Sequence, residues 1–294
     1  MQELLQLGID GIAVGSVLAL AAVGLTLTYG ILRLSNFAHG DLLTLGAYGT
    51  LLVDSVVKNL GLAIGLSALA TVAFSLVLDR VLWSYFRRQR ATPTTMMIAS
   101  IGVALVIRNL IVLIWGASPQ RYNLPTYAAV NLFGMLITFN RLVTIGLAAV
   151  IIGAVYYLLQ NTKLGRAMRA VADNPELAKI SGVNVEKIVG WTWVIAAAAA
   201  VLAGSMYGLI TNLRPGMGWS LILPIFASVI LGGIGNPYGA IAGAMIIGVT
   251  QEVSTYCPDP AGYCLGTDYK LAVGLAMMIL VLLFRPQGLF KGTF

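Results

Sequence analysis

The sequence predicts an all-α integral membrane protein, a polytopic helical bundle of about eight spans that includes discontinuous or re-entrant helices. Of its 294 residues, 59% are hydrophobic and 10% are charged, whereas soluble domains carry about 25% charged residues. The mean hydropathy is +0.89. The apolar runs do not alternate with period two, which excludes an outer-membrane barrel and leaves helices as the spanning elements. Two polar interruptions predict the broken helices.

The continuous spans follow from apolar stretches of about 20 residues. They cover residues 7–29, 42–57, 61–82, 96–115, 142–159 and 188–209, and a last span is centred on 272–283. Pairs of glycines four residues apart favour close helix contacts. These pairs are Gly11 with Gly15, Gly61 with Gly65, and Gly204 with Gly208.

Two segments are poor candidates for plain spans. Residues 29–49 read YGILRLSNFAHGDLLTLGAYG and are too polar, and the apolar stretch 220–251 is interrupted by GGIGNPYG at 232–239. Non-helical backbone at membrane depth persists only where it faces protein or a water-filled cavity. The second segment therefore either crosses the membrane twice or enters and returns.

Basic residues in short loops predict the orientation. The loop with Arg87, Arg88 and Arg90 and the charged loop 161–187 are expected in the cytoplasm, and the C-terminus with Arg285 and Lys291 lies on the same side. The N-terminus, 119–140 and the acidic stretch 252–268 are expected outside. The net charge of +7 is thus explained by topology rather than by nucleic acid. We expect one transmembrane domain over 1–294, with no cleaved signal peptide.

The charged loop at 161–187 is predicted to hold a short helix that begins at Pro175. Asn174 can cap its free N–H groups, and Gly182 would end it in the left-handed conformation. A solvated connector held by anionic lipid headgroups is the alternative. Because such a connector would not need a capped helix, we favour a docking surface for another protein.

Asn36, His39 and Asp41 lie together where helix continuity is doubtful. They are either a contact for protons or substrate at membrane depth, or polar groups that satisfy free backbone atoms at a helix break. We favour the second interpretation.

Arg108 lies deep in the span 96–115, where a central arginine costs about 2.5–3.5 kcal/mol on insertion scales. It should therefore face a partner or a cavity. A substrate carboxylate is one candidate, but we favour pairing with an acidic residue such as Asp54 or Glu252, or an outward snorkelling side chain. Asp79 and Arg80 are expected to form an interfacial pair.

No catalytic or metal-binding pattern is present in the sequence. A single histidine excludes a multi-histidine site, and no GxxxxGK[ST] loop is found. The two cysteines, Cys257 and Cys264, lie in the stretch CPDPAGYC and are expected either to form a disulfide outside the cytoplasm or to remain free thiols.

Three stretches carry a family resemblance. LTLTYGILRLSNFAHGDLLTLGAYG, GRAMRAVADNPELAKISGVN and ILPIFASVILGGIGNPYGAIAGAMIIG together resemble the LivH-like permeases of branched-chain or neutral amino acid ABC transporters, and FRPQGLF near the C-terminus fits as well. The resemblance covers nearly the whole chain, and the NFAHG core is its most specific part.

The resemblance implies a subunit of an importer in the bacterial plasma membrane. Such permeases pair with a LivM-like second permease, two cytoplasmic ATPases that hold the ATP and Mg, and a periplasmic solute-binding protein, so no cofactor is expected on this chain. The loop at 161–187 would be the ATPase-coupling segment, although AVADNPELAKISG lacks the Glu-Ala-Ala triplet of its class. The coupling candidates are Arg166, Arg169, Ala170, Asp173, Asn174, Pro175, Glu176, Leu177, Ala178, Lys179 and Gly182.

The candidates for the translocation pathway come from the two breaks and the buried arginine. They are Tyr29, Asn36, Phe37, His39, Gly40, Asp41, Arg108, Gly232, Gly233, Gly235 and Asn236.

Three other functions compete with amino acid import. A urea or short-amide permease would share the N-terminal motif. An ion-coupled secondary transporter would need more ionisable residues inside its spans, and a membrane-embedded enzyme would need a cluster of catalytic side chains. The sequence favours neither of the last two.

Overall fold

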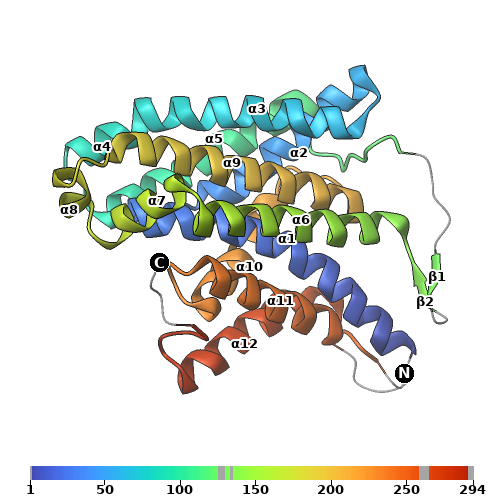
Figure 1. Cartoon of the computed structure of the whole chain (residues 1–294). Helices are drawn as coiled ribbons and strands as arrows, with labels where there is room; N and C mark the ends of the chain where they lie inside the picture. The colour runs from blue at the N-terminus through green and yellow to red at the C-terminus, as the bar shows by residue number, and fades with distance from the viewer. Residues whose placement is uncertain (1, 125–129, 133–134, 258–264, 291–294) are drawn as a thin grey trace.

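The protein folds as a bundle of helices around α1 (Gln2–Leu32), as the computed structural model in Figure 1 shows. The structure describes residues 2–124, 130–132, 135–257 and 265–290. The other helices are α2 (Ala38–Val57), α3 (Leu60–Leu78), α4 (Ser84–Arg88), α5 (Pro93–Trp115), α6 (Phe139–Asn161), α7 (Lys163–Asp173), α8 (Pro175–Ile180), α9 (Val185–Ile210), α10 (Met217–Gly232), α11 (Pro237–Val253) and α12 (Lys270–Phe284). A π-helical turn, Asp79–Trp83, joins α3 to α4, and a 3₁₀ turn, Thr267–Tyr269, precedes α12.

Seven helices of the described part are long and apolar enough to cross a membrane, and α10 is a shorter apolar helix. The predicted all-α, polytopic fold is therefore confirmed. The only strands in the described ranges, β1 (Val130–Leu132) and β2 (Met135–Ile137), form a small antiparallel pair with Val130 opposite Ile137. That pair lies in the segment predicted as an irregular outer loop.

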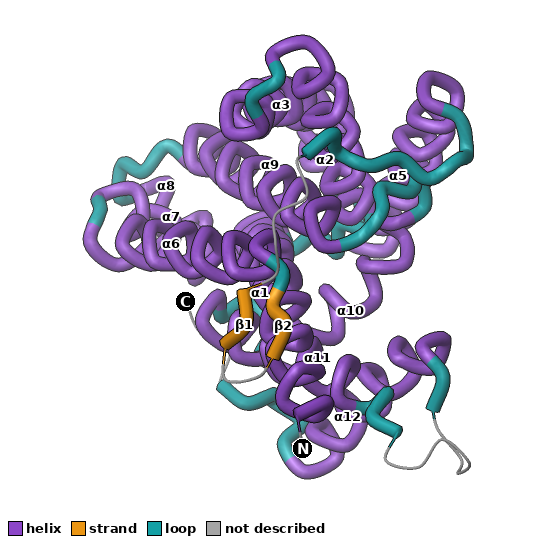
Figure 2. The backbone as a smooth tube through the Cα atoms, turned by 90° about the vertical axis from the view of Figure 1, so that its right-hand side faces the viewer, coloured by secondary structure: helices purple, strands orange, loops and turns teal. Residues whose placement is uncertain are grey.

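Helix α1 lies at the centre of the bundle, in contact with α6, α9, α10 and α11 (Figure 2). Small residues allow these contacts: a Cβ added at Gly11 would lie 2.6 Å from Cα of Val249 in α11, and one at Gly204 would lie 2.1 Å from the carbonyl oxygen of Leu43. Glycine thus brings the helix backbones together, as its spacing predicts. Gly65 meets nothing within 4 Å, so the Gly61–Gly65 pair contacts no neighbouring helix in the described part of the chain.

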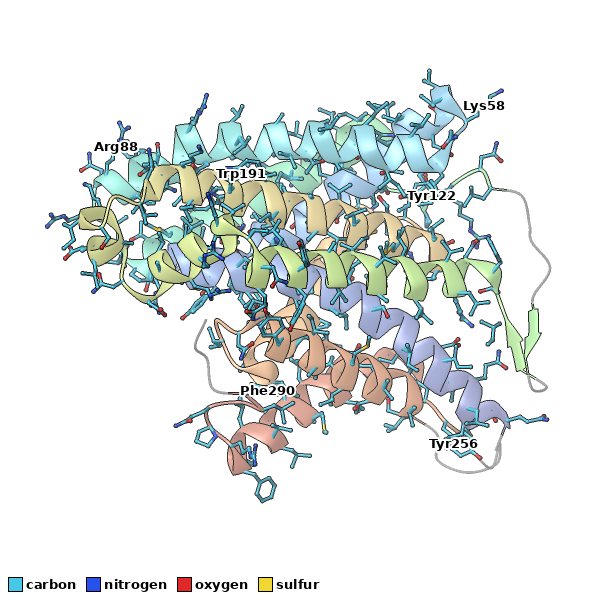
Figure 3. The ribbon with its side chains drawn as sticks, viewed as in Figure 1. Lys58, Arg88, Tyr122, Trp191, Tyr256 and Phe290 are labelled. Carbon is cyan, nitrogen blue, oxygen red and sulfur yellow. The ribbon has the colours of Figure 1, made fainter. Side chains whose placement is uncertain are left out.

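The bundle has two distinct ends. The α8 end holds α4, α7, α8 and the turn between α10 and α11. This turn is held by α6, where Gln160 donates to the Tyr238 hydroxyl at 2.6 Å. The β end holds β1, β2 and the α2–α3 turn. In Figure 3, Arg88 marks the first end and Lys58 marks the second.

Both predicted breaks exist, but they are shorter than expected. Helix α1 continues to Leu32 and α2 begins at Ala38, so only residues 33–37 separate them. The polar residues around the break lie inside helices because the bundle buries and bonds them; Thr28, for example, donates to the carbonyl of Leu25 at 2.9 Å.

The second break is the turn of a helical hairpin. Helices α10 and α11 have 16 and 17 residues and are each about 25 Å long at a rise of about 1.5 Å per residue. Helix α10 begins beside the first turns of α2, where the Gly218 N–H donates to Thr44 Oγ1 at 2.9 Å, and α11 leads the chain back from the α8 end. The chain thus reverses at the second break, as both predicted alternatives require.

Candidate functional site

A capped helix at the α8 end forms the first candidate site. Asn174 Oδ1 accepts hydrogen bonds from the backbone N–H groups of Glu176 and Leu177 at 3.1 and 3.0 Å, and Gly182 has a φ of +87°. The helix begins at Pro175, so the predicted start, cap and stop are all confirmed. The preceding helix α7 was not predicted; Thr162 caps it by accepting from the N–H of Gly165 at 3.1 Å.

Helix α7 attaches this site to the bundle. Its apolar face, with Met168 and Val171, packs with Leu159 of α6 and Trp193 of α9 in one buried cluster. Arg169 donates to the carbonyl oxygen of Leu159. Through these contacts, a force on α8 would reach the ends of α6 and α9.

A second contact of α7 reaches the break between α1 and α2. Arg33, the first residue of the break, donates to the carbonyl oxygen of Ala172 at 3.2 Å. Four residues further, the Phe37 N–H donates to Ser100 Oγ at 3.0 Å. The break is therefore held between α7 and α5.

Helix α8 leaves two large apolar side chains uncovered. Leu177 is 57% exposed and Ile180 is 81% exposed, and residues three apart lie on the same face of a helix. Glu176 and Lys179 are exposed beside them. The predicted coupling residues differ in position: Ala178 is buried and Arg169 is partly buried in the bundle, while Arg166, Ala170, Asp173, Asn174, Pro175 and Gly182 are exposed.

The break between α1 and α2 forms the second candidate site. Asn36 Oδ1 accepts from the Ala38 N–H at 3.1 Å, and His39 Nε2 lies 2.9 Å from the Ala21 carbonyl oxygen in α1. Because a carbonyl only accepts, Nε2 of His39 carries the proton. Asn36 satisfies a backbone group at the break, as we favoured from the sequence, whereas His39 bonds a carbonyl in the middle of α1. The Asn36 Nδ2 group is buried and has no hydrogen-bond partner among the described residues.

Asp41 has a different role from the one predicted. Its carboxylate accepts from Arg108 Nη2 at 3.2 Å and from Nε at 3.4 Å. The prediction that Arg108 pairs with an acidic residue is confirmed, but the two examples named for it are wrong: Glu252 pairs with Lys270 at 2.6 Å, and Asp54 forms no ion pair in the described ranges. The break brings Asp41 to the arginine because α2 begins there and packs against α5.

Helix α10 completes this second site. The Arg108 guanidinium lies 4.9 Å from the centre of the Trp219 ring, and the rings of Phe37 and Phe226 are 4.8 Å apart. Gly40 allows the approach, since a Cβ there would lie 2.3 Å from the Gly218 carbonyl oxygen. Tyr29 lies half-buried in the last turns of α1.

The remaining pathway candidates lie apart from this site. Gly232 ends α10, Gly233 and Gly235 lie in the turn that follows, and Asn236 caps α11 by accepting from the N–H groups of Tyr238 and Gly239. The turn packs against the C-terminal segment, where the Leu289 N–H donates to the Leu231 carbonyl at 2.8 Å. The structure therefore does not bring these four residues together with Asn36, Asp41 and Arg108.

Sequence reasoning missed Trp219 and Tyr122. The Tyr122 hydroxyl donates to the Ala47 carbonyl oxygen at 3.1 Å, and burial raises the pKa of Tyr122 above its usual range. The phenol therefore remains a neutral donor that attaches the loop before β1 to α2. Both aromatic residues lie beside the ends of spans, which was the available signal.

Two other predictions concern side-chain pairs. Asp79 pairs with Arg87 at 2.6 Å, not with Arg80, and it accepts from Trp193 Nε1 at 2.8 Å. The π-helical turn that begins at Asp79 places Arg87 two turns along on the same side. Cys257 is disulfide-bonded, whereas Cys264 lies outside the described residues. Among the described residues, no three His, Cys, Asp or Glu side chains lie close enough together to hold a metal ion.

The chain is similar to known transport proteins over nearly its whole length. The sequence profile of the family described as "Branched-chain amino acid transport system / permease component" matches residues 8–282. The permease protein BraD of the high-affinity branched-chain amino acid transport system of Pseudomonas aeruginosa is 30% identical, with 97% of this chain and 95% of BraD covered. The corresponding LivH of Escherichia coli K12 is also 30% identical, with 97% and 94% covered.

A solved structure shares the fold. A chain of PsaBC from Streptococcus pneumoniae in complex with Fab superposes with a TM-score of 0.53 at 12% identity, covering 97% of this chain and 92% of that one.

Proposed function

Because the chain belongs to the family of branched-chain amino acid transport permease components, we propose that it is the membrane permease subunit of an ATP-driven importer of branched-chain and other neutral hydrophobic amino acids. It acts with a second, similar permease, two cytoplasmic ATPases and a periplasmic solute-binding protein. ATP and Mg belong to the ATPases, and this chain catalyses no reaction of its own.

The structural observation that best supports this proposal is the exposed apolar face of α8. Leu177 and Ile180 project from the end of the bundle beside Glu176 and Lys179. Apolar side chains ringed by charges at a membrane protein's end favour a soluble partner protein over lipid. An ATPase subunit is a partner of this kind.

The contacts of α7 suggest how the partner's motion is transmitted. When the two ATPases close, they push α8; α7 passes the movement to α6 and α9 through Leu159 and Trp193, and to the α1–α2 break through Arg33. The helices then rock and switch the pathway between inward and outward access. The break is suited to this step because only residues 33–37 are non-helical there.

The charge distribution supports the orientation that we propose. Most basic residues of the described part lie in the helices and loops at the α8 end, among them Arg87, Arg88, Arg166, Lys179 and Arg285. Cytoplasmic loops carry an excess of such residues. The α8 end is therefore cytoplasmic, and the N-terminus lies on the periplasmic side of the bacterial inner membrane.

Co-purification tests the assembly. A tagged chain is purified from native membranes in mild detergent, and its partners are identified by mass spectrometry. We expect two P-loop ATPases and a second hydrophobic permease. Recovery of the chain alone, still active in vesicles without ATP, would contradict the proposal and favour a secondary transporter.

A further inference from the structure

A cavity of about 850 Å³ lies at the β end, between α5, α9 and the start of α10. Small-molecule sites in proteins have volumes of roughly 300–1,000 Å³. Its wall combines three arginines, Arg108, Arg121 and Arg214, with apolar side chains. Of the Asp41–Arg108 pair, Arg108 is the member that lines the cavity.

Arg108 is held in a fixed orientation in the wall of this cavity. Its Nε and Nη2 atoms donate to Asp41, and its Cζ lies over the Trp219 ring. The third nitrogen, Nη1, has no hydrogen bond to any described residue. Its side chain is 21% exposed, compared with 1% for Asp41. Arg108 thus offers an oriented donor to whatever occupies the cavity.

Two further arginines, Arg121 and Arg214, line the cavity, and no acidic side chain does. Arg121 and Arg214 are exposed, and neither forms an ion pair within the described ranges. Guanidinium groups bind carboxylates with well-defined geometry. The polar side of the cavity is therefore suited to a carboxylate.

The other side of the cavity is apolar. Val112 lies one turn beyond Arg108 on the same face of α5, and Ile210 and Met217 line the wall as well. A ligand with a carboxylate near Arg108 would place an attached apolar group against these side chains. The combination fits a small amphiphilic acid rather than a sugar or a metal ion.

We propose that this cavity is a solute-binding site in the translocation pathway. Arg108 Nη1 donates to the α-carboxylate of a hydrophobic amino acid, and Val112 and Ile210 contact its side chain. The identity of the solute as an amino acid rests on the proposed function. The Asp41–Arg108 pair then serves to orient the donor.

Direct binding to the purified transporter complex, without the periplasmic binding protein, tests this site. Tritiated leucine is the probe in a scintillation-proximity assay, with alanine and leucinamide as competitors. Leucinamide, which lacks the carboxylate, should compete at least tenfold less well than leucine. Arg108→Lys keeps the positive charge opposite Asp41 but removes the planar guanidinium with its second set of N–H donors. It should weaken leucine binding tenfold or more.

The ratio of leucine to alanine binding shows whether Val112 contacts the solute or only supports the fold. Val112→Phe fills the apolar side, so it should weaken binding of leucine about tenfold relative to alanine. Leu113→Phe is the matched control, because Leu113 is the adjacent residue, is 80% exposed and does not line the cavity. The control should leave the leucine-to-alanine ratio unchanged. Assembly of each variant is checked by its yield on size exclusion.

The outcomes distinguish this site from the proposed function. If the wild-type complex imports leucine with ATP but Val112→Phe leaves the ratio unchanged, or if leucinamide competes as well as leucine, the site is wrong and the function stands. An absence of ATP-driven amino acid uptake by the wild-type complex overturns the proposed function instead.

Discussion

Asp41 is almost fully buried, so its negative charge depends on Arg108 for compensation. Removing one partner of a buried ion pair leaves the other charge uncompensated. The pair also joins two helices, because Asp41 lies in the first turn of α2 and Arg108 is deep in α5. The stability of this crossing should therefore depend on a single carboxylate.

We expect Asp41→Asn to lower the free energy of unfolding by about 2–3 kcal/mol. The amide keeps the size of the side chain but cannot neutralise Arg108. Thermal unfolding of the purified protein in detergent measures the loss. Asp268→Asn, which changes an exposed carboxylate at the β end, is the control and should have little effect. Equal stability of the two variants would show that the pair contributes nothing.

At the residue scale, the sequence predicted local bonds better than distant ones. The cap at Asn174 was predictable because its acceptors and donors lie within three residues of each other. The partner of Arg108 was not, since 67 residues separate it from Asp41 and several carboxylates were equally plausible. Only the crossing of α2 and α5 selects one of them.

Helix crossings decide the packing at the scale of elements. Gly40 of α2 and Gly218 of α10 meet backbone to backbone, and the Gly218 N–H donates to Thr44 Oγ1 at 2.9 Å. Gly40 had been predicted only as a pathway residue. Its contact explains why α10 can approach the break so closely.

Gly40→Ala should destabilise the protein by about 1–3 kcal/mol, because the added methyl group has no room between two backbones. Gly65→Ala is the matched control in α3, where nothing lies within 4 Å and alanine favours the helix. Melting temperatures in detergent compare the two. A decrease for Gly65→Ala as large as that for Gly40→Ala would contradict the close-packing explanation.

Removing the exposed apolar side chains of α8 should weaken binding of the ATPases without unfolding the permease. Leu177→Ala with Ile180→Ala removes exposed apolar area only, so we expect unchanged melting temperature but weaker retention of the ATPases. Quantitative mass spectrometry of the purified complex measures the ratio of ATPase to permease. Ile234→Ala, which truncates a 42% exposed side chain in the α10–α11 turn at the same end, is the control. Full retention in the double variant would exclude these two side chains as anchors.

The element scale also shows where sequence patterns fail. Residues 29–49 are too polar for a plain span, which predicts a longer break than the structure has: all but 33–37 are helical, since the surrounding helices bury and bond the polar groups. The sequence does not predict helix α7, because its many charged residues suggest a loop although its apolar face packs on α6 and α9. Tertiary contacts, which local composition does not reveal, determine both outcomes.

The whole molecule is polarised along its long axis. The basic residues gather at the α8 end, while the cavity opens at the β end. This polarity predicts a fixed orientation in the membrane. The all-α, multi-span architecture and the reversal at 232–239 are predictable from the sequence, but the packing of α10 and α11 against α1 needed the structure.

Cysteine labelling tests the orientation. In a background where Cys257 and Cys264 are changed to serine, Asn123→Cys at the β end should react with a membrane-impermeant maleimide in intact cells. Ser181→Cys at the α8 end should react only after permeabilisation. Both positions are exposed, so accessibility reports the side of the membrane. The reverse pattern would invert the proposed topology.

ATP-driven import is measured as uptake of radiolabelled leucine into proteoliposomes. The purified complex is reconstituted with its binding protein, with ATP or a non-hydrolysable analogue on the α8 side, and with or without a protonophore. We predict uptake that requires hydrolysable ATP and is insensitive to the protonophore. Uptake that continues without ATP and collapses with the protonophore would contradict an ATP-driven permease.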